Sequence, residues 1–416
     1  MRAIICGAGI AGQALAWWLE RDGWEVSVVE RAPGPREEGY MIDFVGSGYD
    51  VAELMGLLPQ LAEIHTKNAV VRYVAPDGSG RGRIDYDRMA QAFDGRAFTF
   101  MRPDLERVLL GQLGEAVTIR YGLTIDAIEE VEDGVVATLS DGSTEAADLL
   151  VGADGIHSRI RDLVFGPEQP LVRYLGYHTA SYVFDDDALR AKLGQQFTLV
   201  ATPDRQAGIY PTNDGRLAAW LIHRAPDPTL PADPAATIRA TYQDLGDLVV
   251  RALAHCPSDR GLYYDQVAQI EMDGWTRGHV TLVGDACQAV SLMAGQGASM
   301  ALGGAYVLAE ELRGDGSIAD ATRRYEQRVR PAVRDKQRAG RRTARWLVPD
   351  SQWRLTVRGL IFDAARLPGL PKLMRPVLKA TRGSLVPPQA LADARLRHSS
   401  GGSLAASGSR ARSDRP

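Results

Sequence analysis

The stretch Gly7-Ala8-Gly9-Ile10-Ala11-Gly12 constrains the fold more than any other part of this sequence. A β-type run at 2–6 precedes it, a helical stretch through Leu19 follows, and a second apolar run at 26–29 ends in Glu30. Glycines at these offsets permit a tight turn, a close approach of backbone to pyrophosphate, and close packing of helix on strand. Glu30 stands where such units bind the hydroxyls of an adenosine ribose. The segment therefore predicts a dinucleotide-binding βαβ unit.

Two other interpretations of this N-terminus are weaker. A basic start with an apolar centre is typical of a signal peptide, and a glycine turn can be an ordinary βα connection. The three glycine offsets together with the acid at residue 30 favour the nucleotide site over both. No later run is long or apolar enough to span a bilayer, and the three cysteines are widely scattered, as in proteins of a reducing compartment. We therefore expect a cytoplasmic protein.

Two further clusters place polar residues directly after predicted strands. In "ADLLVGADGIHSRIR", residues 147–161, Asp154-Gly155 follows a strand at 149–151, so the loop and helix after it can face phosphate or ribose, although an Asp-Gly pair is often a plain turn. In "GDACQAVSLMAGQGASMAL", residues 284–302, a strand at 279–283 ends at Gly284 and Asp285. An acid at the carboxyl end of a strand is well placed to bind a polyol hydroxyl.

The three clusters, in this order, resemble the class A flavoprotein monooxygenases, the group that includes para-hydroxybenzoate hydroxylase. The resemblance extends to about residue 312. Two segments, "GYMIDFVGSGYDVAELMGLL" and "MRPDLERVLL", are similar to the branch with tetracycline-modifying enzymes and aromatic polyketide hydroxylases. The implied fold class is α/β, with a Rossmann-like FAD-binding domain and an inserted, mostly antiparallel substrate sheet.

Pattern and resemblance together divide the 416 residues into five segments. Residues 1–170 and 273–345 would form the FAD-binding domain in two parts, and residues 171–272 the substrate sheet. Residues 346–392 would be a helical segment, and residues 393–416, rich in Ser, Gly and Arg, a disordered tail. A largely buried helix is predicted at 297–312, and basic helices at 321–346 and 351–379.

The resemblance assigns roles residue by residue. The glycine turn and Glu30 would hold the ADP half of a tightly but non-covalently bound FAD, and Arg102 would lie along the pyrophosphate and ribityl chain. Asp154 would serve both FAD and a transiently bound NAD(P)H, and Asp285 a ribityl hydroxyl. The full predicted cofactor-binding set is Gly7, Gly9, Ile10, Ala11, Gly12, Glu30, Arg31, Asp43, Arg102, Asp154, Gly155, Arg161, Gly284, Asp285, Gly295, Gln296, Gly297 and Ala298.

The flavin ring is expected at the start of the helix at 297–312. Residues 295–298 would present backbone N–H groups to flavin N1 and the C2 carbonyl. A helix N-terminus at this edge stabilises the anionic reduced flavin by about 1 to 2 kcal/mol. The second glycine cluster thus predicts an electrostatic site for the flavin.

The implied activity is hydroxylation of an aromatic or polyketide-like small molecule with NAD(P)H and O2, through a flavin C4a-hydroperoxide. The candidate catalytic residues are Leu292, Gln296 and Tyr210; His178, His223 and Arg224 are candidates to orient a phenol or enol, unless they are packed strand residues. Relatives usually read Gly-Asp-Ala-Ala-His and then proline, where this chain has Cys287, Gln288 and Leu292. Leucine frees φ and adds an N–H donor beside the expected reaction centre.

Other functions stay open. The chain could be a flavin-dependent oxidoreductase without oxygen insertion, a drug-inactivating monooxygenase of the tetracycline type, or a flavoprotein that binds a ligand or partner through its basic C-terminal helices. Halogenation is disfavoured because the motif Trp-x-Trp-x-Ile-Pro is absent and no lysine stands at the expected place. We expect no metal, because the histidines lack ligand spacing, and no nucleic-acid partner, because the net charge is −4. A monomer without membrane association is expected, with a dimer as the alternative.

Overall fold

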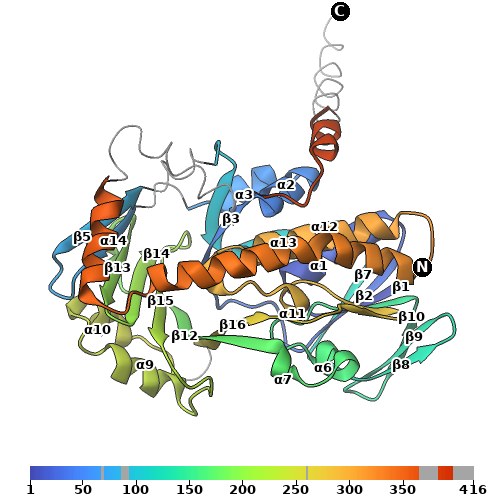
Figure 1. The fold of residues 1–416 in the computed structure, drawn as a ribbon, viewed down its shortest axis with the longest axis horizontal. Coiled ribbons are helices and arrows are strands. Elements are labelled where there is room, and N and C mark those ends of the chain that lie inside the picture. Colours follow the sequence, from blue (N-terminus) through green and yellow to red (C-terminus); the bar gives the residue numbers. More distant parts are fainter. Residues whose placement is uncertain (67–69, 86–92, 259–260, 365–382, 397–416) are drawn as a thin grey trace, which may run out of the picture.

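The chain forms two large sheets at opposite ends of the molecule, bridged by one long helix (Figure 1). A computed structural model describes residues 1–66, 70–85, 93–258, 261–364 and 383–396. No helix in these ranges has the length and apolarity that crossing a bilayer requires.

The first sheet carries the nucleotide-binding unit. Its strand order is β17-β18-β11-β1-β2-β7, and all neighbours pair in parallel except β17 with β18. Because the order reverses at β1, the carboxyl ends of β1 and β11 border a crevice, the usual ligand position in such sheets. The strands are β1 (Arg2–Cys6), β2 (Glu25–Glu30), β7 (Val117–Tyr121), β11 (Leu149–Gly152), β17 (Thr276–Arg277) and β18 (Val280–Leu282).

Helices α1 (Ile10–Arg21) and α12 (Gly297–Leu312) pack on each other against this sheet. The central strands are continuous apolar runs because both of their faces are covered, and α12 is buried from Ser299 to Ala309. The helix predicted at 297–312 is confirmed, as is the α/β fold class.

The second sheet is mostly antiparallel, as predicted. Its order is β16-β12-β15-β14-β13-β4-β5, and only β13 and β4 run parallel. Two of its strands come from residues 70–85, so the sheet is not confined to the predicted segment 171–272. The strands are β4 (Val70–Val74), β5 (Gly80–Asp85), β12 (Val172–Phe184), β13 (Gln196–Thr202), β14 (Arg205–Pro211), β15 (Leu217–Arg224) and β16 (Tyr263–Ile270).

The two faces of this sheet differ. One face packs on α9 and α10 through Tyr182, Ile238 and Tyr242. The other carries an aromatic cluster that includes Tyr73, Phe197 and Tyr210. The helices of this region are α8 (Asp187–Leu193), α9 (Pro234–Tyr242) and α10 (Asp247–Leu253).

Shorter elements join the two sheets. They are β3 (Met41–Val45) paired with β6 (Ala97–Met101); the sheet of β8 (Ile125–Val131), β9 (Gly134–Leu139) and β10 (Thr144–Ala147); the helices α2 (Ser47–Leu54), α3 (Leu58–Ile64), α5 (Arg102–Leu110), α6 (Arg159–Phe165), α7 (Glu168–Leu171) and α11 (Asp285–Gln288); and the 3-10 helix η1 (Leu292–Ala294).

Helix α13 (Ile318–Leu347) crosses from the first sheet to the second, and α14 (Gln352–Ala364) packs on β5 (Figure 1). The basic helix predicted at 321–346 is thus confirmed and slightly longer. The continuation of the next helix from 365 to 379 lies outside the described residues. Residues 388–396 are helical, so the disorder predicted from 393 is wrong for 393–396, and the rest of that tail lies outside the described residues.

Candidate functional site

A cavity of about 490 Å³ lies between the two sheets. Its wall combines the β1–α1 turn, the Asp-Gly loop, the segment from Asp285 to the start of α12, and the aromatic face of the second sheet. Predicted residues that line it are Gly9, Ile10, Ala11, Asp43, Arg102, Gly155, Tyr210, Asp285, Leu292, Gly295, Gln296, Gly297 and Ala298. The structure therefore brings together most of the predicted cofactor and catalytic residues, although the first of them, Gly9, and the last, Ala298, are 289 positions apart in the sequence.

A second cavity of about 280 Å³ shares Gly9 with the first and is lined by Glu30. The Glu30 carboxylate accepts hydrogen bonds from the N–H groups of Ala8 and Ala32, each at 2.8 Å. A carboxylate has about four lone-pair sites, so two remain for ribose hydroxyls. This cavity fits the adenosine end of a dinucleotide.

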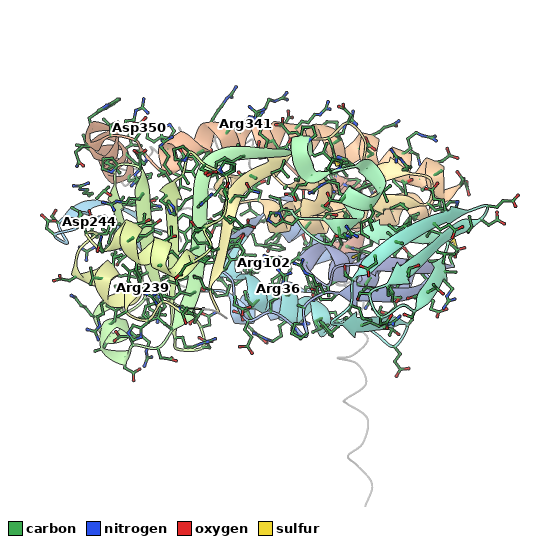
Figure 2. The ribbon with its side chains drawn as sticks, turned by 90° about the horizontal axis from the view of Figure 1, so that it is seen from below. Arg36, Arg102, Arg239, Asp244, Arg341 and Asp350 are labelled. Atoms are coloured by element: carbon green, nitrogen blue, oxygen red, sulfur yellow. The ribbon has the colours of Figure 1, made fainter. Side chains whose placement is uncertain are left out.

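Arg102 lies near the middle of the molecule, between the sheets (Figure 2). Its guanidinium pairs with Glu106 at 3.2 Å, and a Cβ on Gly9 would still stand 4.0 Å from it. The missing side chain of Gly9 thus leaves space beside a fixed cation where the two cavities meet. The carboxylate of Asp285 is exposed to the larger cavity, although the surrounding protein removes enough water to raise its pKa.

The start of α12 is an open hydrogen-bonding end. No side chain caps this 16-residue helix, and its first turn carries no acidic residue. Gly295 turns the chain with φ of 61°, which glycine adopts without strain, and Gly297 and Ala298 follow in the cavity wall. Helix N–H groups without partners bind anions and carbonyl oxygens. Together with the space at Gly9 and the acid at Glu30, this end fits FAD across both cavities.

The remaining predicted cofactor residues, Gly7, Gly12, Arg31, Asp154, Arg161 and Gly284, lie outside the lining of both cavities. Gly12 acts through packing, because a Cβ there would meet the Gly7 oxygen at 1.9 Å. The Asp154 carboxylate accepts from the Ser158 hydroxyl at 2.6 Å and from the Ile160 N–H at 3.1 Å. It therefore fixes the loop that carries Gly155, and burial raises its pKa.

Arg161 requires a correction. Its side chain has no exposed surface, and its guanidinium donates to the carbonyl oxygens of Ala286 at 3.0 Å and Ile156 at 2.8 Å. The sequence suggested that Arg161 faces a phosphate of the cofactor. Its guanidinium instead has two backbone partners inside the protein and does not face phosphate. It positions the chain beside Asp285 instead.

The residues that replace the family pattern have different surroundings. Gln288 is buried and donates to the Tyr325 hydroxyl at 2.6 Å, and burial raises the pKa of the Cys287 thiol well above its usual range. Both lie outside the cavity wall, so neither is placed for reaction. Leu292 lines the cavity directly after Ser291, a non-glycine residue at φ of 74°.

The carbonyls of Ala289 and Val290 are held by Gln337 of α13 and Gln269 of β16, which sequence reasoning missed. The amide of Gln337 donates to the carbonyls of Ile270 at 2.7 Å and Ala289 at 3.0 Å. Gln269 donates to Val290 and to the Gln337 carbonyl, both at 3.0 Å. Two glutamines thus fix the backbone just before Leu292, the position where the family resemblance would place a proline. The sequence signal was weak: polar residues on the otherwise apolar face of an amphipathic helix.

Replacing Gln337 by leucine should loosen this segment. Two buried carbonyls would lose a donor, and we expect the free energy of unfolding to fall by about 1–2 kcal/mol. Chemical denaturation measures the loss, and Gln327→Leu, an exposed position on the same helix, is the matched control. Equal stability of both variants would contradict the role assigned to Gln337.

Three polar candidates of the second sheet, His178, His223 and Arg224, are not brought to the cavity. His178 and His223 are hydrogen-bonded to Tyr264 and Tyr242, and burial lowers the pKa of His223 to about 4. Arg224 pairs with Asp204 at 2.5 Å. All three lie outside the cavity wall: the two histidines are packed strand residues, and Arg224 is an exposed residue at the end of β15. Tyr210 does line the cavity, and its hydroxyl accepts from the Met41 N–H at 3.0 Å.

The substrate side of the cavity is aromatic, with two buried donors. Tyr73, Phe197 and Trp220 line it. Within the described chain, the buried Gln206 Nε2 and Trp220 Nε1 have no hydrogen-bond partner. The Gln206 Oε1 accepts a hydrogen bond from Arg358 at 3.2 Å. Because a guanidinium only donates, the oxygen end of the amide must face Arg358, and the amide N–H groups are left for the cavity.

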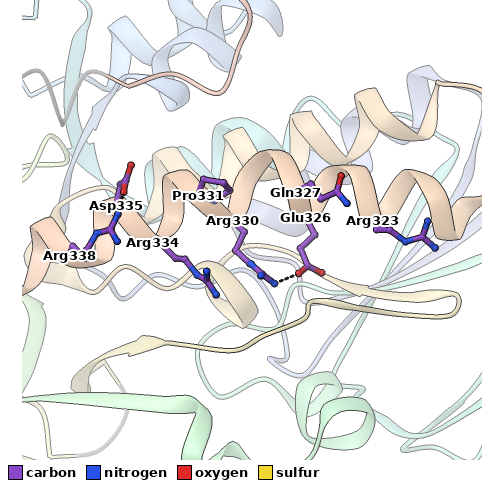
Figure 3. Close-up of a pocket in the computed structure, with 8 residues that line it drawn as sticks. All are labelled: Arg323, Glu326, Gln327, Arg330, Pro331, Arg334, Asp335 and Arg338. Carbon is purple, nitrogen blue, oxygen red and sulfur yellow. Dashed lines mark hydrogen bonds and ion pairs between the residues drawn. The ribbon is translucent and has the colours of Figure 1, made fainter.

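The basic helix carries a separate open hollow, formed by Arg323, Glu326, Gln327, Arg330, Pro331, Arg334, Asp335 and Arg338 (Figure 3). Arg330 pairs with Glu326 at 2.5 Å, and the arginines point away from the helix axis. None of the predicted site residues lies here, and the hollow is a charged, solvated helix face.

Known proteins resemble this chain over most of its length. The family model described as "FAD binding domain" matches residues 1–338. A Mycobacterium tuberculosis protein named as uncharacterized is 34% identical over 321 residues, covering 75% of this chain and 85% of that protein. A flavin-dependent monooxygenase of an unknown prokaryotic organism is 28% identical over 352 residues, with 82% and 88% covered.

Among solved structures, the tetracycline destructase Tet(55) superposes with a TM-score of 0.77 at 26% identity, covering 92% of this chain and 98% of that one. The glycine turn, the Asp-Gly loop and the segment from Asp285 to α12 all lie within the matched range 1–338. The chain therefore belongs to the FAD binding domain family, as a class A flavoprotein hydroxylase of the para-hydroxybenzoate hydroxylase type.

Proposed function

We propose that the protein is an NAD(P)H- and O2-dependent monooxygenase that hydroxylates a planar aromatic or polyketide-like small molecule bearing a carbonyl or phenolate oxygen. Bound FAD would take a hydride from the nicotinamide and pass its electrons to O2, and one oxygen atom would enter the substrate while the other leaves as water. The single observation that carries the proposal is the shared cavity, in which the expected flavin end and an aromatic chamber meet.

The wall residues have the tasks that this chemistry requires. Tyr73, Phe197 and Trp220 exclude water and stack on a flat ring, which keeps reactive oxygen from being lost to solvent. Gln206 and Trp220 offer buried donors that only an acceptor on the ligand can satisfy. Leu292 and Tyr210 remain proposed as residues next to the reaction centre, and Gln296 at the flavin.

The test uses the yellow protein without oxygen first. NADH or NADPH should bleach the flavin, and air with ¹⁸O2 should then give a product with one labelled oxygen atom for some member of an aromatic panel. If all electrons are recovered as hydrogen peroxide with every compound, the protein is an oxidase and the proposal fails. If neither nicotinamide bleaches the flavin, the proposed co-substrate is wrong.

Tetracycline is the first compound of that panel, because Tet(55) is named a tetracycline destructase and shares 26% identity with this chain. Labelled, inactivated tetracycline would favour drug inactivation over tailoring of a natural product. No reaction with tetracycline but labelled product from another aromatic compound would favour the tailoring role.

Replacing Gln206 by leucine should weaken binding of the best panel compound about tenfold, because one buried hydrogen bond is worth about 1–1.5 kcal/mol. The perturbation of the flavin spectrum on titration measures the affinity. Flavin content should not change, since Gln206 lies in β14, away from the expected flavin. Gln243→Leu, an exposed position after α9, is the control. Unchanged affinity in Gln206→Leu would mean that the ligand does not meet this amide.

A further inference from the structure

We propose that Lys336 is a buried counter-charge for the reduced flavin, and that it acts through the side chain of Gln296 at the start of α12. The inference rests on the FAD site alone and requires neither the proposed substrate nor oxygen chemistry. It makes Lys336 a positioning and electrostatic residue, not a catalytic one.

Lys336 lies on the buried face of α13. Its side chain is 8% exposed, and the same face carries Tyr325, Val329 and Val333, all buried. Four arginines of the helix, Arg323, Arg330, Arg334 and Arg338, instead line the open hollow described above (Figure 3). Lys336 is the one lysine of α13, and among the described side chains of this helix it is the one basic residue that is buried.

No acidic group compensates this ammonium in the part of the chain that the structure describes. Its Nζ donates to the Oε1 of Gln296, and burial alone lowers its pKa to about 8. The group is therefore still mostly protonated at neutral pH. A buried charge without an opposite charge is costly, and a bound anion would offset that cost.

The partner that the site can supply is an anion at the start of α12. Gln296 is the N-cap residue of α12 and lines the cavity next to Gly297 and Ala298. The ammonium and the positive end of an uncapped helix therefore meet at the same residue, Gln296. Reduction of a flavin places negative charge on its pyrimidine edge, and fixed positive charge there favours the reduced form over the oxidised one.

A purely structural role predicts something different. If Lys336 only anchored Gln296, its removal would loosen α12 and weaken oxidised and reduced FAD equally. A counter-charge acts on the difference between the two states, and by linkage this difference is the midpoint potential of the bound flavin.

The experiment measures the midpoint potential of the bound flavin by equilibration with reference dyes, without oxygen, nicotinamide or substrate. In Lys336→Met we expect a more negative potential, equivalent to about a tenfold or larger loss of preference for reduced over oxidised FAD. Affinity for oxidised FAD should change much less. Lys336→Arg keeps the charge and should stay close to the unmodified protein.

The matched control is Arg334→Met, which removes a charge from the exposed face of the same helix. If Lys336→Met does not fold, Lys336→Gln takes its place, because its amide can still donate to Gln296 while the charge is lost. An unchanged potential in a folded, FAD-loaded Lys336 variant without charge would overturn the proposal. So would an equal shift in Arg334→Met. Failure of hydroxylation, in contrast, would leave the potential measurement valid.

Discussion

Replacing Gly12 by alanine is expected to leave the protein without bound FAD. A Cβ at this position would stand 1.9 Å from the carbonyl oxygen of Gly7, 3.1 Å from its carbonyl carbon, and 3.3 Å from Ile5 Cγ2. Two of these atoms are backbone, so no side-chain rotation relieves the clash. Helix α1 must move away from β1, and the glycine turn must open.

Both consequences can be measured. Displacement of the turn removes the N–H groups and the close approach that a pyrophosphate needs, so FAD affinity should fall about 100-fold or more. Overpacking should also lower the free energy of unfolding of the apoprotein by about 1–3 kcal/mol. The flavin absorbance per protein after purification reports the first effect, and denaturation of the apoprotein the second.

Gly274→Ala is the matched control, because a Cβ at Gly274 meets nothing within 4 Å. It should purify with a full complement of flavin. A yellow Gly12→Ala protein with unchanged affinity would show that the turn is not the nucleotide site and would contradict the placement of FAD across both cavities.

What the sequence could predict was the local part of this site. The glycine turn, Glu30, the Asp-Gly loop and the helix at 297–312 depend on residues close in sequence, and each carries its own spacing signal. Their meeting in one place followed from the rule that the carboxyl ends of parallel strands share an edge. The central strands and α12 were therefore placed nearly as the structure has them.

The rest depends on contacts between distant residues. Val70–Val74 pairs in parallel with residues 196–200, and no local pattern announces that a strand joins a sheet formed mainly a hundred residues later. The contact between Lys336 and Gln296 spans forty residues, and a single lysine in a basic helix has no periodic signal. Side-chain direction was equally hidden, since His178, His223 and Arg161 were plausible from position alone and are turned into the protein.

Arg161 gives the second large expected effect, and it separates positioning from cofactor contact. Arg161→Met keeps most of the side-chain volume but leaves the carbonyls of Ala286 and Ile156 without their donor. Two buried carbonyl oxygens without a hydrogen-bond donor should lower the free energy of unfolding of the apoprotein by about 2–4 kcal/mol. Removal of the buried charge of Arg161 should offset part of this loss. Arg159→Met, exposed on the same helix, should change it little.

The two roles of Arg161 are distinguished by how much saturating FAD raises the free energy of unfolding. This increment depends only on the concentration of FAD and on its affinity for the protein. If Arg161 only positions the backbone beside Asp285, the increment should stay within about 0.5 kcal/mol of that in the unmodified protein, which is the usual effect of a change without direct contact. A guanidinium bound to phosphate would instead contribute about 1.5–3 kcal/mol, and the increment would fall by that amount. Denaturation of apo and FAD-loaded protein side by side therefore decides between the structural assignment and the one that the sequence suggested.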